Sequence, residues 1–219
     1  MDSSHARLTA LQKQTLRAFF AEERGFFLTG GAALAGFHLG HRSTSDLDLF
    51  TLDASAFERG RHALARVAES LQGTLVVRQD APGFKRFVLS QGGDAVVVDL
   101  VLERVVQRVP QKLEIDGIIV DPAQEIVANK LNTIVSRMEE RDLVDLYCLE
   151  RAGYDVESAL PSAEAKDGGC TPATLAWLLS EIRIPDDAKL PGDVTSEELR
   201  AYVEDLLLRL RRKAFPIHE

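Results

Sequence analysis

Apolar residues along this chain either recur at helical spacing, three or four residues apart, or form short runs. The first pattern predicts helices and the second predicts strands. Near the start, apolar positions at helical spacing predict a helix over about 8–24 (Leu8, Leu11, Leu16, Phe19 and Phe20). Short apolar runs predict strands near 26–29, 46–51, 74–80, 84–90, 94–102 and 113–119, with a helix near 54–71. Pro82-Gly83 and Gly92-Gly93 predict hairpin turns between successive runs. The first half of the chain should therefore form a mixed β-sheet with helices packed on it.

From about residue 121 onward the chain has mainly helical spacing. Asp121-Pro122-Ala123-Gln124 is typical of a helix start and predicts a helix over about 122–137, followed by one that opens at Arg141. Further helices are expected near 155–165, 171–182 and 195–213. We therefore expect an α+β fold, with a mixed-sheet core and N-terminal helix over residues 1–120 and a C-terminal helical bundle over residues 121–219.

Two aspartates lie two residues apart on one predicted strand. In Asp46-Leu47-Asp48 the acids alternate with leucine, so both carboxylates should project from the same face of the sheet. Mg²⁺ suits such a pair, because it prefers oxygen ligands and is held by one or two carboxylates together with substrate phosphates. Mn²⁺ accepts the same ligands. A strand, the glycine turn Gly30-Gly31 and a short helix precede the pair, an order that suggests a nucleoside triphosphate site.

A third aspartate, Asp99, interrupts the apolar run AVVVDLVL. Such a run is typical of a strand covered on both faces, where an unpaired carboxylate would cost several kcal/mol. A metal ion shared with Asp46 and Asp48 would compensate the charge, and two ions about 3.5–4 Å apart stabilise the attacking and leaving oxygens of a phosphoryl displacement. The alternative is that Asp99 pairs with an arginine while Asp46 caps a turn.

Composition agrees with an ordinary enzyme. The chain has 219 residues, of which 45% are hydrophobic, and no apolar run approaches the ~20 residues that span a bilayer. The N-terminus lacks the pattern of a signal peptide, so we expect a cytoplasmic protein that does not enter a membrane. The net charge of −8 argues against a large nonspecific nucleic-acid footprint. Two local basic clusters remain, which are either phosphate contacts or solvated helix faces balanced by acids (Arg104, Arg108 and Lys112; Arg209, Arg211, Arg212 and Lys213).

The motifs together resemble a known family. Gly30-Gly31-Ala-Ala-Leu34, Leu39-Gly40-His41-Arg42 and Asp46-Leu-Asp48-Leu-Phe50 resemble the nucleotidyltransferase toxins of the AbiEii/AbiGii type, within the DNA polymerase β-like superfamily. A downstream block, Lys130-Leu131 followed by Arg137 and Arg141-Asp142-Leu-Val-Asp145-Leu-Tyr147, resembles the family's second signature. With Asp99, the resemblance spans about residues 26–150. It implies a nucleotidyltransferase core. The C-terminal third carries no recognised motif, and we expect its helices to complete a bundle that walls the nucleotide cleft.

Two positions near the first motif depart from the family pattern. Relatives in the superfamily often have Ser at the position of Gly31, so backbone amides at the helix start would have to bind phosphate here. Thr44 stands where Ser is usual and keeps the hydroxyl. Arg42 is a candidate phosphate ligand because guanidinium binds phosphate bidentately, although it and His41 could instead hold the turn against the sheet.

The resemblance assigns roles to the downstream block. Lys130 would contact the triphosphate, and Arg137, seven residues later on the same helix face, would support it or hold an acid. Arg141 and Asp145 would belong to the active site, with Asp145 orienting Lys130 or a substrate hydroxyl. The alternatives are that Lys130 is a surface lysine and that Arg141 pairs with Asp145 across one turn.

The resulting hypothesis is a Mg²⁺-dependent nucleotidyltransferase that moves a nucleoside monophosphate from ATP, GTP, CTP or UTP to an acceptor hydroxyl and releases pyrophosphate. Asp46, Asp48 and Asp99 would hold the metal ions. The resemblance implies a toxin with an antitoxin partner, and tRNA or protein as acceptor. The alternatives are a small-molecule nucleotidyltransferase of the antibiotic-modifying kind and a noncatalytic nucleotide-binding module.

Overall fold

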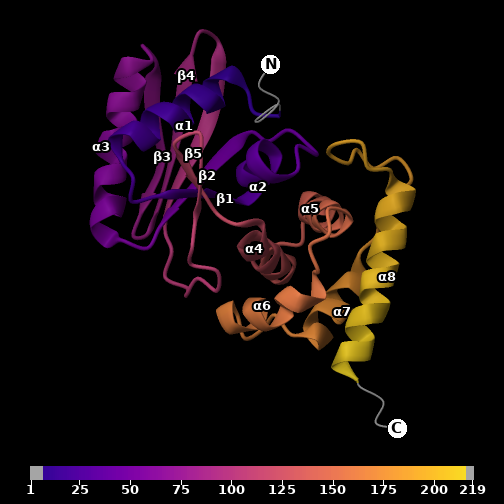
Figure 1. Cartoon of the computed structure of the whole chain (residues 1–219). Helices are drawn as coiled ribbons and strands as arrows, with labels where there is room; N and C mark the ends of the chain where they lie inside the picture. Colours follow the sequence, from indigo (N-terminus) through magenta and orange to yellow (C-terminus); the bar gives the residue numbers. More distant parts are fainter. Residues whose placement is uncertain (1–6, 216–219) are drawn as a thin grey trace. The chain divides into compact units, whose positions relative to one another are not determined.

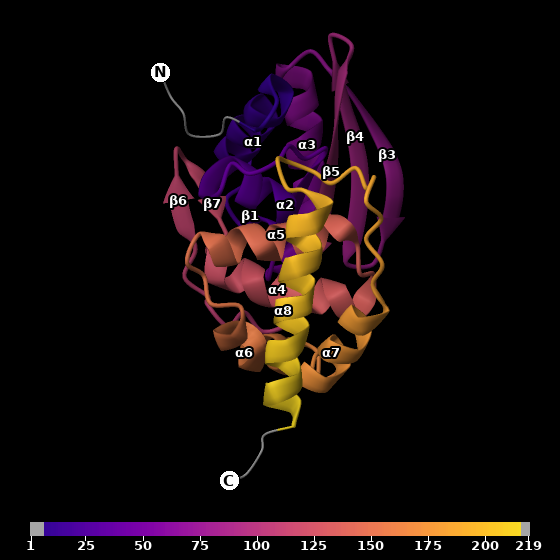
Figure 2. The ribbon, with the colours of Figure 1, turned by 90° about the vertical axis from the view of Figure 1, so that its right-hand side faces the viewer.

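The computed structural model describes residues 7–215 and divides into two compact units. The first contains the residues up to Val105 together with Val109–Pro122, and the second contains Val106–Arg108 together with the residues from Ala123 onward. Figures 1 and 2 show the first unit in indigo to magenta and most of the second in orange to yellow. The boundary expected after residue 120 lies close to this division.

The first unit is built on a seven-stranded sheet of order β3-β4-β5-β2-β1-β7-β6. Its strands are β1 (Phe27–Thr29), β2 (Asp46–Thr51), β3 (Thr74–Ala81), β4 (Phe84–Gln91), β5 (Asp94–Leu102), β6 (Leu113–Ile115) and β7 (Ile118–Val120). Strand β2 runs parallel to β5 and β1 runs parallel to β7, whereas the other neighbouring pairs are antiparallel. The mixed sheet and the α+β class expected from the sequence are confirmed.

Helices α1 (Ala10–Glu22) and α3 (Ala54–Ser70) pack together and cover one face of this sheet (Figure 1). The rings of Phe19 on α1 and Phe26 before β1 meet edge to face, with centroids 5.3 Å apart. Gly60 lets α3 approach closely, because a Cβ there would lie 2.8 Å from both Leu100 on β5 and Phe26. The main core of the unit therefore lies between this helix pair and one side of the sheet.

Two strand predictions are corrected. Strand β5 is not covered on both faces: Val98 and Leu100 are fully buried, whereas Val97 and Val101 on the other face are only half-buried. The single strand expected over 113–119 is a hairpin of β6 and β7, because the backbone reverses between them at Asp116-Gly117, where both φ angles are positive. The sequence did carry a signal for this turn, because Asp-Gly accepts positive φ angles and is typical of a two-residue hairpin turn.

The second unit is helical, as expected for the C-terminal region. It contains α4 (Ala123–Ser136), α5 (Glu140–Arg151), the 3₁₀ turn η2 (Glu157–Ala159), α6 (Leu160–Lys166), α7 (Pro172–Glu181) and α8 (Ser196–Ala214). Helix α4 contacts α5, α6 and α7, and the long α8 packs against α7 and α5 (Figure 2). Thr195 and Glu198 form a capping box at the start of α8. Within residues 7–215, no helix is long and apolar enough to cross a membrane.

Candidate active site

The three aspartates predicted to act together lie on two adjacent strands of the first unit. In the parallel pairing of β2 and β5, Asp48 stands opposite Asp99, and Asp46 lies two residues earlier on β2. The buried positions of β2 alternate with its acids, so Asp46 and Asp48 point to the same face, as predicted. That face is opposite the one that carries Leu100 and the helices. Sheet register thus collects carboxylates that are about fifty residues apart in the sequence.

Asp99 is paired with a basic side chain that the sequence reasoning did not single out. Arg86 on β4 stands opposite Asp99 in the antiparallel pairing of β4 and β5. Its Nε donates to Asp99 Oδ1 at 2.8 Å and its Nη2 donates to Oδ2 at 2.6 Å, a bidentate ion pair. The Asp99 side chain is 5% exposed, whereas the Arg86 side chain is 45% exposed. The alternative interpretation of Asp99, that it pairs with an arginine, is therefore correct in this structure.

The three carboxylates lie near one another but do not form a preformed metal-binding site. Among the residues that the structure describes, no three His, Cys, Asp or Glu side chains are grouped closely enough to hold a metal ion. Asp99 is held by Arg86, and Asp46 Oδ1 accepts a hydrogen bond of 2.7 Å from the Thr44 hydroxyl. The donor set still suits Mg²⁺ or Mn²⁺, which take carboxylate oxygens and leave positions for substrate phosphates. Asp46 and Asp48, with Asp99, are the residues that would hold such an ion.

The glycine turn lies directly against these acids. Gly30 begins helix α2 (Gly30–Ala33) with φ +64°, and a Cβ there would lie 2.4 Å from Asp48 Oδ2. At Gly31 a Cβ would lie 2.7 Å from Arg42 Nη2 and 3.5 Å from the Thr44 hydroxyl. The guanidinium of Arg42, which is buried, thus occupies the space that a serine side chain at position 31 would need. A serine at position 31 would therefore require the Arg42 side chain to shift.

The structure brings the residues predicted in the first unit together. Gly30, Gly31, Arg42 and Thr44 lie beside Asp46 and Asp48, and Asp99 stands on the next strand. Helix α2 continues as one π-helical turn, Leu34–His38, a distortion that is frequent at functional sites. This corner of the sheet combines a tight backbone turn, a buried arginine and three carboxylates, which are groups of the kinds that bind phosphate and divalent ions.

A hydrogen bond from Thr29, the residue opposite Asp48 on β1, connects the strand beside the acids to Asp121. Thr29 on β1 stands opposite Asp48, and its hydroxyl donates to Asp121 Oδ2 at 2.7 Å. Asp121, which is fully buried, is also bound by Lys112, whose ammonium lies 4.1 Å from the centre of the Phe27 ring. Lys112 therefore forms an ion pair within the first unit. Helix α4 begins at Ala123, and the Asp121 carboxylate is bound by Thr29 and Lys112.

The downstream block forms its own buried charge cluster in the second unit. Lys130 on α4 is 4% exposed, so it is not a surface lysine. Its Nζ lies 2.7 Å from Asp142 Oδ1 and 2.6 Å from Asp145 Oδ2, and both aspartates on α5 are fully buried. Asp145 thus contacts Lys130, as expected. The alternative in which Arg141 pairs with Asp145 is not what the structure shows, because Arg141 pairs with Glu139.

Arg137 completes this cluster by holding an acid. Its Nε donates to Asp142 Oδ2 at 2.9 Å and its Nη2 donates to Oδ1 at 3.0 Å, so Lys130 and Arg137 share one carboxylate. Burial alone would raise the pKa of Asp142, but hydrogen bonds and charge from Arg137 and Lys130 outweigh it and lower that pKa. Asp142 is therefore the anion that Lys130 and Arg137 share. It belongs to the downstream motif, but the sequence did not lead us to predict it as a site residue.

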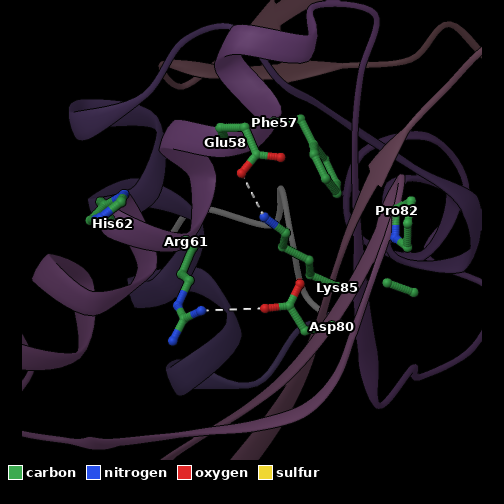
Figure 3. A pocket seen from close by; sticks show the side chains of 8 residues that line it. Phe57, Glu58, Arg61, His62, Asp80, Pro82 and Lys85 are labelled. Carbon is green, nitrogen blue, oxygen red and sulfur yellow. Dashed lines mark hydrogen bonds and ion pairs between the residues drawn. The ribbon is translucent and has the colours of Figure 1, made fainter.

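Two other features give no sign of a reactive site. A hollow of about 570 Å³ lies on the helix-covered side of β4, where Lys85 pairs with Glu58 and Arg61 pairs with Asp80 (Figure 3). Its charges are balanced within the hollow. In the C-terminal basic cluster, Arg209 and Lys213 are bound to acidic side chains (Glu150, Glu157 and Asp205), which matches the interpretation of a balanced helix face.

Comparisons with known proteins agree with the geometry. A family model described as "Nucleotidyl transferase AbiEii toxin, Type IV TA system" matches residues 14–216. A crystal structure of a candidate nucleotidyltransferase from Helicobacter pylori aligns with a TM-score of 0.59 at 18% identity, covering 95% of each chain. The structure of JHP933 from Helicobacter pylori aligns with a TM-score of 0.56 at 19% identity, covering 93% of this chain and 92% of that one. At these identities the alignments show a shared fold. A search of curated proteins found no match.

Proposed function

The chain belongs to the AbiEii nucleotidyltransferase toxin family, and on that premise we propose that it moves a nucleoside monophosphate from a nucleoside triphosphate to an acceptor hydroxyl. The acceptor oxygen would attack the α-phosphorus, the bond to the β-phosphate oxygen would break, and pyrophosphate would leave. The observation that carries the proposal is the register that sets Asp48 opposite Asp99, beside a glycine turn.

The first unit supplies the groups for the reacting end of the nucleotide. Asp46, Asp48 and Asp99 provide oxygen ligands for a divalent ion, which when bound would neutralise phosphate charge and stabilise the attacking and leaving oxygens. The buried Arg42 would bind phosphate, and the turn at Gly30 allows the main chain to approach it closely. Asp99 would accept the proton of the attacking hydroxyl.

The role of the second block is refined by its contacts. Lys130 already binds two buried carboxylates, so we propose that it acts by holding Asp142 and Asp145 in place on α5. Arg137, whose side chain is 44% exposed, and Arg141 are the members of this block that solvent can reach, and they are the candidate anion-binding residues of the second unit.

The type IV toxin–antitoxin description of the family supports an antitoxin protein as a partner. We propose tRNA or a protein hydroxyl as the acceptor. The noncatalytic alternative has one observation in its favour, the ion pair between Asp99 and Arg86, because that pair satisfies the buried carboxylate without a metal ion.

One experiment separates these functions. Purified protein is incubated with each α-labelled nucleoside triphosphate and Mg²⁺, with and without total tRNA, beside Asp99→Asn. Label on RNA or on protein that depends on Asp99 and Mg²⁺ would support the proposal and identify the base. Ser90→Ala, on the same face of the sheet next to the Asp99 strand, serves as the matched control and should keep activity. Binding of a triphosphate without any transfer would favour the noncatalytic module.

A further inference from the structure

Arg86 is the one basic side chain that the register of the sheet directs at the three aspartates from a neighbouring strand, among the residues that the structure describes. On β4 the side chains alternate, and Lys85 points to the other face, where it pairs with Glu58 at 3.1 Å (Figure 3). Arg86 points to the acid face and stands opposite Asp99, which in turn stands opposite Asp48. The row therefore reads as arginine, aspartate, aspartate across three adjacent strands.

The contact between Arg86 and Asp99 uses both oxygens of the carboxylate. Nε and Nη2 approach Oδ1 and Oδ2 at 2.8 and 2.6 Å, which is the fork geometry of a strong guanidinium–carboxylate pair. Asp99 is nearly buried, so without a nearby cation its charge would be costly. Asp48, placed directly beside it, adds repulsion between like charges. One guanidinium offsets both effects.

The two partners differ in their freedom to move. The Arg86 side chain is 45% exposed and the Asp99 side chain is 5% exposed. The arginine has room to move into solvent when another cation takes its place at Asp99, whereas the aspartate is fixed by the sheet. A cation that binds Asp99 must either displace the guanidinium or bind beside a positive charge, and both raise the free energy of the bound state.

We propose that Arg86 is the resident counter-ion of the Asp46, Asp48 and Asp99 group, a positioning residue that competes with the divalent cation for Asp99. This inference rests on the proposed function and deepens it. Arg86 holds Asp99 in place before substrate arrives and keeps the affinity for a bare divalent ion low. A triphosphate carries enough negative charge to offset Arg86, so metal and nucleotide bind together rather than in succession.

The test measures Mn²⁺ binding without nucleotide, by the electron paramagnetic resonance signal of the free ion, in wild type, Arg86→Gln and Arg78→Gln. Arg78 is exposed on β3, so its substitution removes the same charge from the same sheet without touching the acids. Arg86→Gln should bind Mn²⁺ on the order of tenfold more tightly, the effect of a unit charge about 6 Å from a divalent ion in a water-like dielectric. Arg78→Gln should stay within about twofold of wild type.

A thermodynamic cycle tests the positioning role without metal. In chelator, Arg86→Gln should lower the unfolding temperature of the wild-type background, and the loss should largely disappear in the Asp99→Asn background, because the two residues then no longer form an ion pair. A structural role alone would give the stability loss but no gain in Mn²⁺ affinity.

The outcomes separate this inference from the proposed function. Unchanged or weaker Mn²⁺ binding by Arg86→Gln, with wild type active in nucleotidyl transfer, would overturn the counter-ion role and leave the proposed function standing. If neither wild type nor Arg86→Gln binds Mn²⁺ and wild type transfers no nucleotide, the metal site and the inference both fail. The inference is supported if Arg86→Gln binds Mn²⁺ more tightly while Arg78→Gln does not, and if the thermodynamic cycle shows coupling between Arg86 and Asp99.

Discussion

Replacing Lys130 with methionine tests the buried charge cluster of the second unit most directly. Methionine keeps most of the side-chain volume and removes the ammonium, so it should open little cavity space. Two aspartates that are both 0% exposed, Asp142 and Asp145, would then have one cation fewer between them. Removing one partner of a buried ion pair costs about 3–5 kcal/mol. We expect a loss of that size at about pH 7.

The stability cost of Lys130→Met should depend on pH because the pKa of Asp142 is lowered in the folded protein. Burial raises that pKa, but the contacts to Arg137 and Lys130 lower it by more. A carboxyl whose folded-state pKa is depressed contributes stability above its unfolded pKa and loses it as pH falls through the folded value. In Lys130→Met that pKa should rise. The cost of the substitution should therefore shrink as pH falls from about 7 toward about 4, where protonation relieves the buried charge.

The assay is urea unfolding followed by far-UV circular dichroism at several pH values. Arg137→Gln is the matched control: it removes a cation from the same carboxylate, but its side chain is 44% exposed, so we expect a loss of only about 1 kcal/mol. A cost for Lys130→Met below about 1 kcal/mol at neutral pH, or one that is unchanged at acid pH, would refute the assignment of Lys130 as the cation that stabilises this cluster.

Three further predictions concern single positions. Gly30→Ala should abolish transfer and destabilise the protein by about 1–2 kcal/mol or more, because φ is +64° and the new Cβ would lie 2.4 Å from Asp48 Oδ2; unchanged activity of the purified variant would contradict this. Burial raises the pKa of the Cys170 thiol to about 12, so a thiol reagent at mildly alkaline pH should modify the half-buried Cys148 in the native protein and reach Cys170 only after unfolding, as peptide mapping would reveal. Thr195→Ala removes the N-cap of α8 and should lower the free energy of unfolding by about 1 kcal/mol, whereas Thr195→Ser should leave it nearly unchanged.

Local pattern in the sequence was enough to predict most of the elements and the acid face of β2. Alternation of Asp46 and Asp48 with leucines fixes which side of a strand they occupy, whatever the strand pairs with. Positions such as Gly83 and Gly92, where φ is positive, mark turns that nearly any fold would keep. Helix periods and the Thr195 capping box depend only on neighbours within a few residues, so they survive in any tertiary context.

Tertiary structure decided which charges meet. The sequence predicts that Asp99 needs a compensating cation, but whether it is a metal ion or an arginine depends on the register of β4 against β5, which places Arg86 opposite Asp99. Register is set by packing of the helix-covered face and by turn geometry, and a shift of one residue would have presented Lys85 instead. Likewise, helix spacing put Lys130 and Arg137 on one face, but only the packing of α5 against α4 made Asp142 their common partner. Ion pairs between elements are long-range in sequence, and pattern along the chain cannot specify them.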